Sequence, residues 1–136
     1  MKTAPRTVRE IMSDTLVVLG EDETLTDLAE NMERFSLRHL PVVAGDRLVG
    51  LITHRDVLRA AVLGGQRRAD DPPLRVREIM SRDVITVSPS LHLTLAADML
   101  IERKVGCLLV VDEGGALVGI VTENDFLKLA RTLLAS

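Results

Sequence analysis

The sequence contains one set of motifs twice, in the same order, and this repeat constrains the fold more than any other feature. Val8–Ser13 reads VREIMS, and Val76–Ser81 repeats it 68 positions later with the same letters. Towards the end of each copy, GLITHRDVL at 50–58 corresponds to GIVTENDFL at 119–127. A long unit that is used only twice is not a solenoid, which stacks several short repeats. The chain is therefore expected to fold as two related units.

Each copy shows the same order of expected secondary structure. A short apolar strand, Leu16–Leu19 or Val84–Val87, follows the VREIMS segment. An amphipathic helix comes next, with apolar residues at helical spacing from Leu25 to Phe35 and from Leu93 to Leu100. Two β-branched strands and a final helix complete the unit. The order strand, helix, strand, strand, helix predicts an α/β fold.

The boundaries of the units follow from the repeat and from a change in composition. We predict one unit at 8–63 and the other at 76–134. Residues 64–75 are rich in glycine, proline and charge, which is typical of a linker. One unit alone would bury its helix faces poorly, so the two are expected to pack together with pseudo-two-fold symmetry.

Composition excludes several classes of function. A net charge of −3 gives no basic surface for nucleic acid, and Phe35 and Phe126 are the only aromatic residues, so a base-stacking platform is not expected. The single cysteine, Cys107, lies in an apolar segment and is expected to be a small core residue. The chain has no secretory signal and no apolar run that could span a membrane, so we expect a cytoplasmic protein with no membrane partner. The sequence shows no recognisable set of metal ligands and no nucleophile with a partner base, so we do not expect an enzyme.

The pattern Gly-x-x-Thr-x-x-Asp stands at a strand-to-helix junction in both copies, and it has two interpretations. Thr-x-x-Asp is close to the capping box, in which the acid reaches back to the start of the helix. The same geometry suits a ribose phosphate: free N–H groups and the threonine hydroxyl would bind phosphate, and the carboxylate would accept from two ribose hydroxyls. The glycine would let a ligand approach the strand. The first motif is Gly50, Thr53 and Asp56, and the second motif is Gly119, Thr122 and Asp125.

Paired units that open with VREIMS, contain RHLPVV and close with GLITHRDVL resemble a tandem pair of cystathionine-β-synthase (CBS) domains, a Bateman module. The resemblance covers about residues 8–130. It implies two pseudo-symmetric β-α-β-β-α units that pack as one module with two clefts. It also implies that these clefts bind an adenosyl ligand: AMP, ADP, ATP, NAD or S-adenosylmethionine.

The resemblance implies further site residues beyond the two motifs. Apolar residues would hold the adenine, with Met12 and Val17 sharing a cleft with Asp125. Two residues before the LPVV strand and two after Thr53 could reach phosphate. Core packing would explain the four apolar residues equally well, and a solvated first helical turn would explain the two residues after Thr53. The residues added in this way are Met12, Val17, Met80, Ile85, Arg38, His39, His54, Arg55 and Asn124, of which Met80 and Ile85 would share a cleft with Asp56.

The residues that follow each threonine predict that the two sites differ. Arg55 adds positive charge at the first motif, whereas Glu123 places a carboxylate beside the phosphate position of the second. Because like charges repel, we expect the first motif to bind a phosphorylated ligand more tightly. The second motif should tolerate a ligand such as S-adenosylmethionine.

The most consistent function is a stand-alone regulatory module that binds an adenosyl ligand and requires no cofactor. Its output would be a target protein or its own assembly, and the resemblance implies a homodimer. The alternative is a ligand-independent interaction or dimerisation module, in which the motifs only cap helices.

Overall fold

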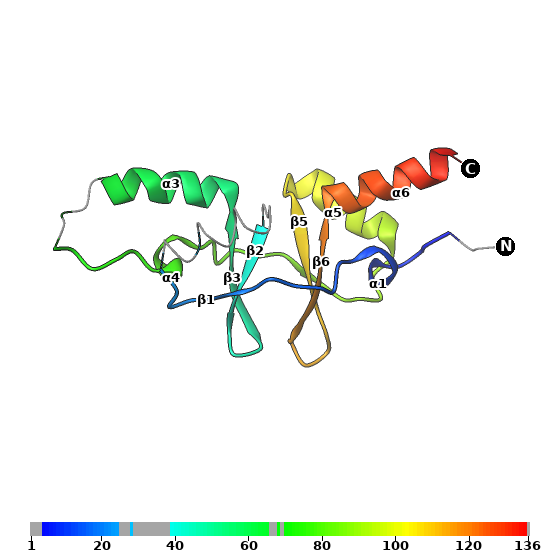
Figure 1. The fold of residues 1–136 in the computed structure, drawn as a ribbon. Helices are drawn as coiled ribbons and strands as arrows, with labels where there is room; N and C mark the ends of the chain where they lie inside the picture. The colour runs from blue at the N-terminus through cyan, green and yellow to red at the C-terminus, as the bar shows by residue number, and fades with distance from the viewer. Residues whose placement is uncertain (1–3, 25–27, 29–38, 66–67, 69, 136) are drawn as a thin grey trace. The chain divides into compact units, whose positions relative to one another are not determined.

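The computed structural model of the 136-residue chain describes residues 4–24, 28, 39–65, 68 and 70–135. The chain divides into two compact units, one made of residues 1–16 and 85–136 and the other of residues 17–84. Each unit contains one three-stranded sheet with helices beside it (Figure 1).

The unit of residues 17–84 contains the sheet β1-β2-β3. The strand β1 (Leu19–Gly20) pairs in parallel with β2 (His39–Ala44), which pairs antiparallel with β3 (Arg47–Thr53). Gly45, in the turn between β2 and β3, has φ +67°, a left-handed conformation that glycine adopts without strain. The helix α3 (His54–Gly65) begins at the residue after β3, so the first motif spans the junction.

The other unit repeats this arrangement with the sheet β4-β5-β6. The strand β4 (Thr86–Val87) is followed by α5 (Leu93–Arg103), and β4 pairs in parallel with β5 (Cys107–Val111). The strand β6 (Leu117–Thr122) pairs antiparallel with β5 and continues directly into α6 (Glu123–Ala135). The second motif therefore also spans a strand-to-helix junction.

Each unit also contains a short helix that comes from the other sequence copy. The helix α1 (Val8–Ile11) belongs to the unit with β4, β5 and β6, and α4 (Val76–Ile79) belongs to the unit with β1, β2 and β3. Val8, Val76 and Ile79 are buried in the cores of the units that receive them. The compact units thus differ from the sequence copies, because the two copies exchange their VREIMS segments.

Backbone hydrogen bonds hold the exchanged helices at their N-termini, where N–H groups have no partner inside the helix. The first two N–H groups of α1 donate to the carbonyls of Leu91 and Pro89, both at 2.9 Å. Those of α4 donate to the carbonyls of Glu23 and Glu21 at 2.8 and 2.9 Å. The equivalent segment of the other copy accepts in both cases, so the exchange is symmetrical.

The predicted α/β fold class is confirmed, and residues 85–135 show the predicted element order in full. The helix expected from Leu25 to Phe35 lies outside the described residues except for Leu28, which is buried. The first strand of each copy is shorter than predicted, because β1 begins at Leu19 and β4 begins at Thr86. The chain passes between the units at 16–17 and 84–85, so only the residues after each crossing can join the sheet.

Each unit has an apolar core between its sheet and its helices. In the unit of residues 17–84, Leu40, Val42 and Ile52 of the sheet are fully buried, and Met80 is part of the same cluster. The other core contains Leu108, Val110 and Val121 together with three buried residues of α5. Among the described residues, no helix has both the length and the hydropathy needed to cross a membrane.

Candidate functional site

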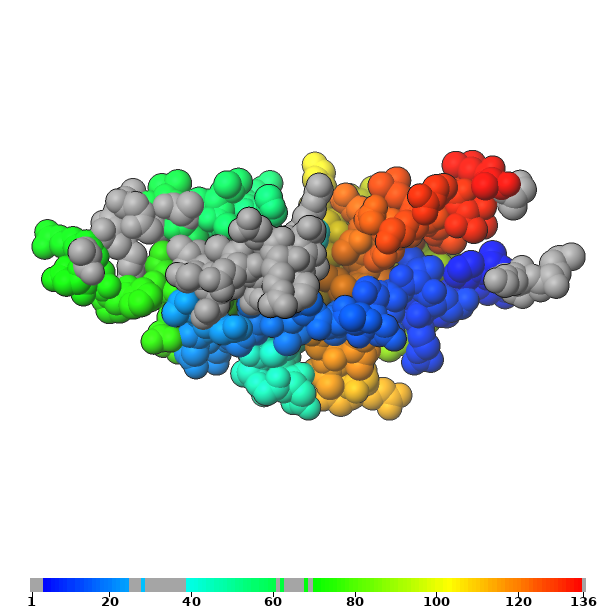
Figure 2. All heavy atoms as spheres, in the orientation of Figure 1, coloured from blue at the N-terminus to red at the C-terminus, as the bar shows by residue number. Residues whose placement is uncertain are grey.

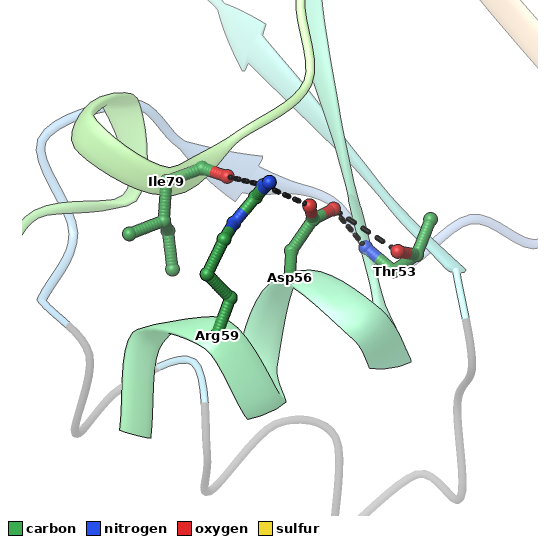
Figure 3. Close-up of polar contacts among 4 residues, drawn as sticks. All are labelled: Thr53, Asp56, Arg59 and Ile79. Carbon is green, nitrogen blue, oxygen red and sulfur yellow. Dashed lines mark hydrogen bonds and ion pairs between the residues drawn. The ribbon is translucent and has the colours of Figure 1, made fainter. Parts of the chain in front are cut away.

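In the first motif, the Asp56 carboxylate accepts hydrogen bonds from Thr53 and Arg59 (Figure 3). Its Oδ2 accepts from the Thr53 backbone N–H at 2.8 Å and from the Thr53 hydroxyl at 3.1 Å. Its Oδ1 accepts from the Arg59 guanidinium at 2.7 Å. Asp56 is only 5% exposed. The acid reaches back to the start of α3 as the capping-box interpretation predicts, and it is also half of an ion pair.

Arg59 connects the motif to the exchanged helix of the same unit. The guanidinium nitrogen that contacts Asp56 also lies 3.5 Å from the Ile79 carbonyl, at the end of α4 (Figure 3). That carbonyl belongs to the last residue of a helix, where no partner inside the helix is available. Arg59 was not among the predicted site residues. Its position three residues after Asp56 on a helix is the signal that could have identified it.

The second motif shares the cap but has no equivalent ion pair. Asp125 Oδ2 accepts from the Thr122 N–H at 2.8 Å and from the Thr122 hydroxyl at 3.2 Å. Lys128 occupies the position that corresponds to Arg59 and is exposed. Within the described part of the chain no ion pair joins Lys128 to Asp125, and nothing donates to Asp125 Oδ1. Asp125 is half-buried, so its carboxylate is more accessible than that of Asp56.

The motif glycines serve close packing. A Cβ on Gly50 would lie 2.5 Å from the sulfur of Met80 and 3.0 Å from the Ser81 carbonyl oxygen. A Cβ on Gly119 would lie 2.5 Å from the sulfur of Met12. A methionine of the exchanged segment therefore occupies the space that was expected to admit a ligand to the strand. Each glycine is needed because that methionine crosses it.

The exchanged segment is bound to the strand beside the glycine. The backbones of Ser81 and Leu51 exchange two hydrogen bonds of 2.9 Å, and those of Ser13 and Ile120 exchange two of 2.9 and 3.0 Å. These bridges bring Met80 to the first motif and Met12 to the second. Each methionine therefore packs against the glycine of one motif. Its contact with a ligand stays a prediction.

The other predicted site residues are brought together only in part. His54 and Arg55 are exposed in the first turn of α3, and Asn124 is exposed in the first turn of α6. Glu123, whose charge was expected to distinguish the second motif, is also exposed. The role of these four side chains stays a prediction.

Four more residues were predicted at the site. His39 is half-buried at the start of β2, and Arg38 lies outside the described residues. Val17 and Ile85 belong to different units from the aspartates with which they were expected to share a site. Their pairing with those aspartates therefore stays a prediction.

The remaining titratable and metal-binding groups offer no second site in the described residues. Burial raises the pKa of the Cys107 thiol to about 12, so this residue stays a neutral core side chain at physiological pH. In the part of the chain that the structure describes, no group of three or more histidine, cysteine, aspartate or glutamate side chains is placed to bind a metal ion. The two motifs are therefore the candidate site.

Comparison with known proteins identifies relatives of the whole chain. Over 130 residues it is 35% identical to an uncharacterised protein of Methanocaldococcus jannaschii, MJ1225; the match covers 89% of this chain and 46% of that protein. The chain thus spans less than half the length of this relative. A crystal structure of a putative acetoin utilization protein, AcuB, from Vibrio cholerae is 34% identical with a TM-score of 0.81, and the match covers 95% of this chain and 93% of that one.

Two solved relatives contain adenosyl ligands. The CBS domain pair of protein MJ0100, in complex with 5′-methylthioadenosine and S-adenosyl-L-methionine, is 26% identical with a TM-score of 0.79. It matches 91% of this chain and 98% of its own. CBSX2 in complex with AMP is 27% identical with a TM-score of 0.81, and the match covers 95% and 98% of the two chains. The family model for the CBS domain matches residues 8–63 and again residues 76–131, and the chain therefore belongs to the CBS domain family, as a tandem pair.

Proposed function

We propose that this CBS domain pair is a regulatory module that binds an adenosyl ligand at the two Gly-x-x-Thr-x-x-Asp motifs. The observation that carries the proposal is the repeated carboxylate at the start of a long helix, bound to the preceding threonine with the same geometry in both units. Solved relatives with the same fold bind AMP, or 5′-methylthioadenosine and S-adenosylmethionine. The proposed role is regulation by ligand binding, with no catalytic step.

The motif residues divide the ligand between them. Each carboxylate oxygen has two lone pairs, so an aspartate that caps its threonine still accepts hydrogen bonds from ribose hydroxyls. The N–H groups in the first turn of α3 and α6 attract a phosphate, although that of Glu123 already donates to the Gly106 carbonyl at 3.1 Å. The helix dipole favours the same charge. The aliphatic residues near each motif, among them Met12 and Met80, would contact the base. Arg38, His39 and Arg55 stay candidates for phosphate in the unit of residues 17–84.

Isothermal titration calorimetry of the full chain tests the proposal. AMP, ATP, NAD and S-adenosylmethionine are titrated separately, because the sequence has no Trp or Tyr and intrinsic fluorescence gives little signal. We expect saturable binding of at least one of these ligands. We also expect the double variant Asp56→Asn, Asp125→Asn to weaken it strongly. Failure of all four ligands to bind would favour the ligand-independent interaction module.

Exposed apolar side chains favour self-association as the output of the module. Leu58 on α3 and Leu127 on α6 are 66% and 67% exposed and occupy equivalent positions in the two copies. The helix α6 lies on the surface of its unit (Figure 2), and Leu134 near its end is 86% exposed. We propose a homodimer, which sedimentation of the chain and of the Leu58→Ser, Leu127→Ser variant would test. If both proteins are monomers, the module would act through a target protein instead. The cytoplasmic location stays a prediction.

A further inference from the structure

We propose that Arg59 is a built-in competitor for the ribose-binding carboxylate of the first motif, so that this motif requires an anionic ligand. The second motif has no such competitor and accepts a neutral nucleoside. The inference rests on the proposed function, since it assumes that adenosyl ligands bind at the motifs. It adds a rule of selectivity that neither the family model nor the relatives supply.

The first motif has no carboxylate oxygen without a donor. Thr53 donates twice to Asp56 Oδ2, and Arg59 donates to Oδ1 at 2.7 Å (Figure 3). The Asp56 side chain is 7% exposed, whereas the Arg59 side chain is 59% exposed. The covering group is therefore the exposed member of the pair. Oδ2 already accepts two hydrogen bonds and Oδ1 accepts one, so both hydroxyls of a ribose can donate to Asp56 only if the guanidinium moves aside.

Displacing Arg59 has a different consequence for neutral and anionic ligands. Ribose hydroxyls replace the hydrogen bond to Asp56, but they leave the guanidinium without an anion. A phosphate supplies that anion and suits the planar donor geometry of arginine. The guanidinium starts 2.7 Å from the carboxylate that would bind the ribose, so it is already close to such a ligand. When AMP displaces Arg59 from Asp56, its phosphate gives the guanidinium a new anionic partner. Adenosine has no phosphate and gives it none.

The second motif lacks this exchange. Asp125 is half-buried, and no described residue donates to its Oδ1. Lys128 replaces Arg59 in the equivalent position and is exposed. Adenosine therefore meets a free carboxylate oxygen at Asp125. The donors to each carboxylate belong to the same unit as that carboxylate.

Variants that isolate one motif make the competition measurable. In Asp125→Asn protein, which retains the first motif, calorimetry gives the dissociation constants of adenosine and AMP with and without Arg59→Gln. We expect Arg59→Gln to strengthen adenosine binding about fivefold or more, because an ion pair no longer has to be broken, and to weaken AMP binding. If Arg59 had only a structural role, its substitution would not be expected to strengthen the binding of a neutral ligand.

The matched control is Lys128→Gln in Asp56→Asn protein, which retains the second motif. In that protein we expect the ratio of the dissociation constants of adenosine and AMP to be the same with and without Lys128→Gln. AMP binding at the second motif of otherwise unmodified Arg59→Gln protein verifies that this variant folds. We expect the Arg59→Gln protein to fold, because the Arg59 side chain is exposed.

The outcomes separate this inference from the proposed function. If adenosine and AMP bind the Asp125→Asn protein but Arg59→Gln leaves adenosine binding unchanged or weaker, the competitor role is wrong and the proposed function stands. If only the Arg59→Gln protein binds adenosine, the inference is supported. If no variant and no unmodified protein binds either ligand, the proposed function fails for these probes and the inference fails with it.

Discussion

Met80 lies directly over Gly50, in the space where any other residue at position 50 would place its Cβ. That Cβ would be 2.5 Å from the methionine sulfur, closer than real Cβ atoms approach, and 3.0 Å from the Ser81 carbonyl oxygen, which is an unusually tight contact. Met12 covers Gly119 in the same way. In each unit a segment from the other sequence copy is therefore packed against the motif glycine, which makes the glycine a determinant of stability as well as a candidate site residue.

Substitution of either glycine should destabilise its unit. We expect Gly50→Ala and Gly119→Ala to lower the free energy of unfolding by about 1–3 kcal/mol, because the methionine is flexible but the serine carbonyl is backbone and cannot yield as easily. Gly114→Ala is the matched control, since its nearest atom is an Asp112 carboxylate oxygen at 3.5 Å. Chemical denaturation followed by circular dichroism measures all three. Equal stability of Gly50→Ala and Gly114→Ala would contradict the packing account.

The two motif aspartates should contribute unequally to stability. Asparagine still accepts a hydrogen bond at the start of a helix but has no charge, so Asp125→Asn is expected to cost about 1 kcal/mol or less. Asp56→Asn also removes the ion pair with Arg59, and should cost about 1–2 kcal/mol after allowance for the exposure of the guanidinium. Melting temperatures and ligand affinities are measured on the same samples. A stability loss at Asp56 with unchanged affinity would reduce the motif to a helix cap.

The ribose role of the aspartates can be tested with the ligand alone. If Asp56 or Asp125 accepts from both ribose hydroxyls, 2′-deoxy-AMP leaves one carboxylate lone pair unmatched. We expect it to bind about tenfold to a hundredfold more weakly than AMP in calorimetry. Equal affinity for the two nucleotides would show that the aspartates do not bind the ribose diol.

Glu123 should weaken phosphate binding at the second motif. It stands in the first turn of α6 and is exposed, so its repulsion of a phosphate is screened by solvent. We expect Glu123→Arg to strengthen AMP binding about two- to fivefold in Asp56→Asn protein, which retains only the second motif. Glu113→Arg, in the exposed turn before β6, makes the same change in net charge and should have a smaller effect. If both substitutions act equally, a general charge effect replaces the local one.

Cys107 should be unreactive while the protein is folded. Burial raises its pKa from 9.0 to about 12, so the folded state disfavours the thiolate. Its contribution to stability is complete below about pH 9 and is lost as the pH rises towards 12. At pH 8 a thiol reagent such as 5,5′-dithiobis(2-nitrobenzoic acid) should label the chain only after denaturant is added. Rapid labelling of folded protein would show that the strand β5 opens.

Features whose partners lie close together along the chain could be predicted from the sequence. The reach of Asp56 back to Thr53, and of Asp125 back to Thr122, spans three residues at a strand-to-helix junction, so spacing alone indicated the cap. Apolar periodicity likewise predicted α5 and the strand pair β5–β6. The contact between Arg59 and Asp56 is equally local, yet a helical arginine has many possible rotamers. The Ile79 carbonyl, from a distant segment, helps to select this one.

Periodicity and spacing do not determine which copy of the VREIMS segment packs against which sheet. The tertiary structure shows that each segment packs in the unit that contains the sheet of the other copy. The two segments have identical letters, so each would offer the same apolar residues to either sheet, and periodicity does not distinguish the choices. The choice depends on the path of the chain between the units at 16–17 and 84–85 and on the carbonyls that receive the N–H groups of α1 and α4. That choice places Met80 over Gly50 and Ile79 beside Arg59. The chemical difference between the two nearly identical motifs comes instead from position 59, where an arginine forms an ion pair with Asp56, whereas the equivalent Lys128 forms none with Asp125 among the described residues.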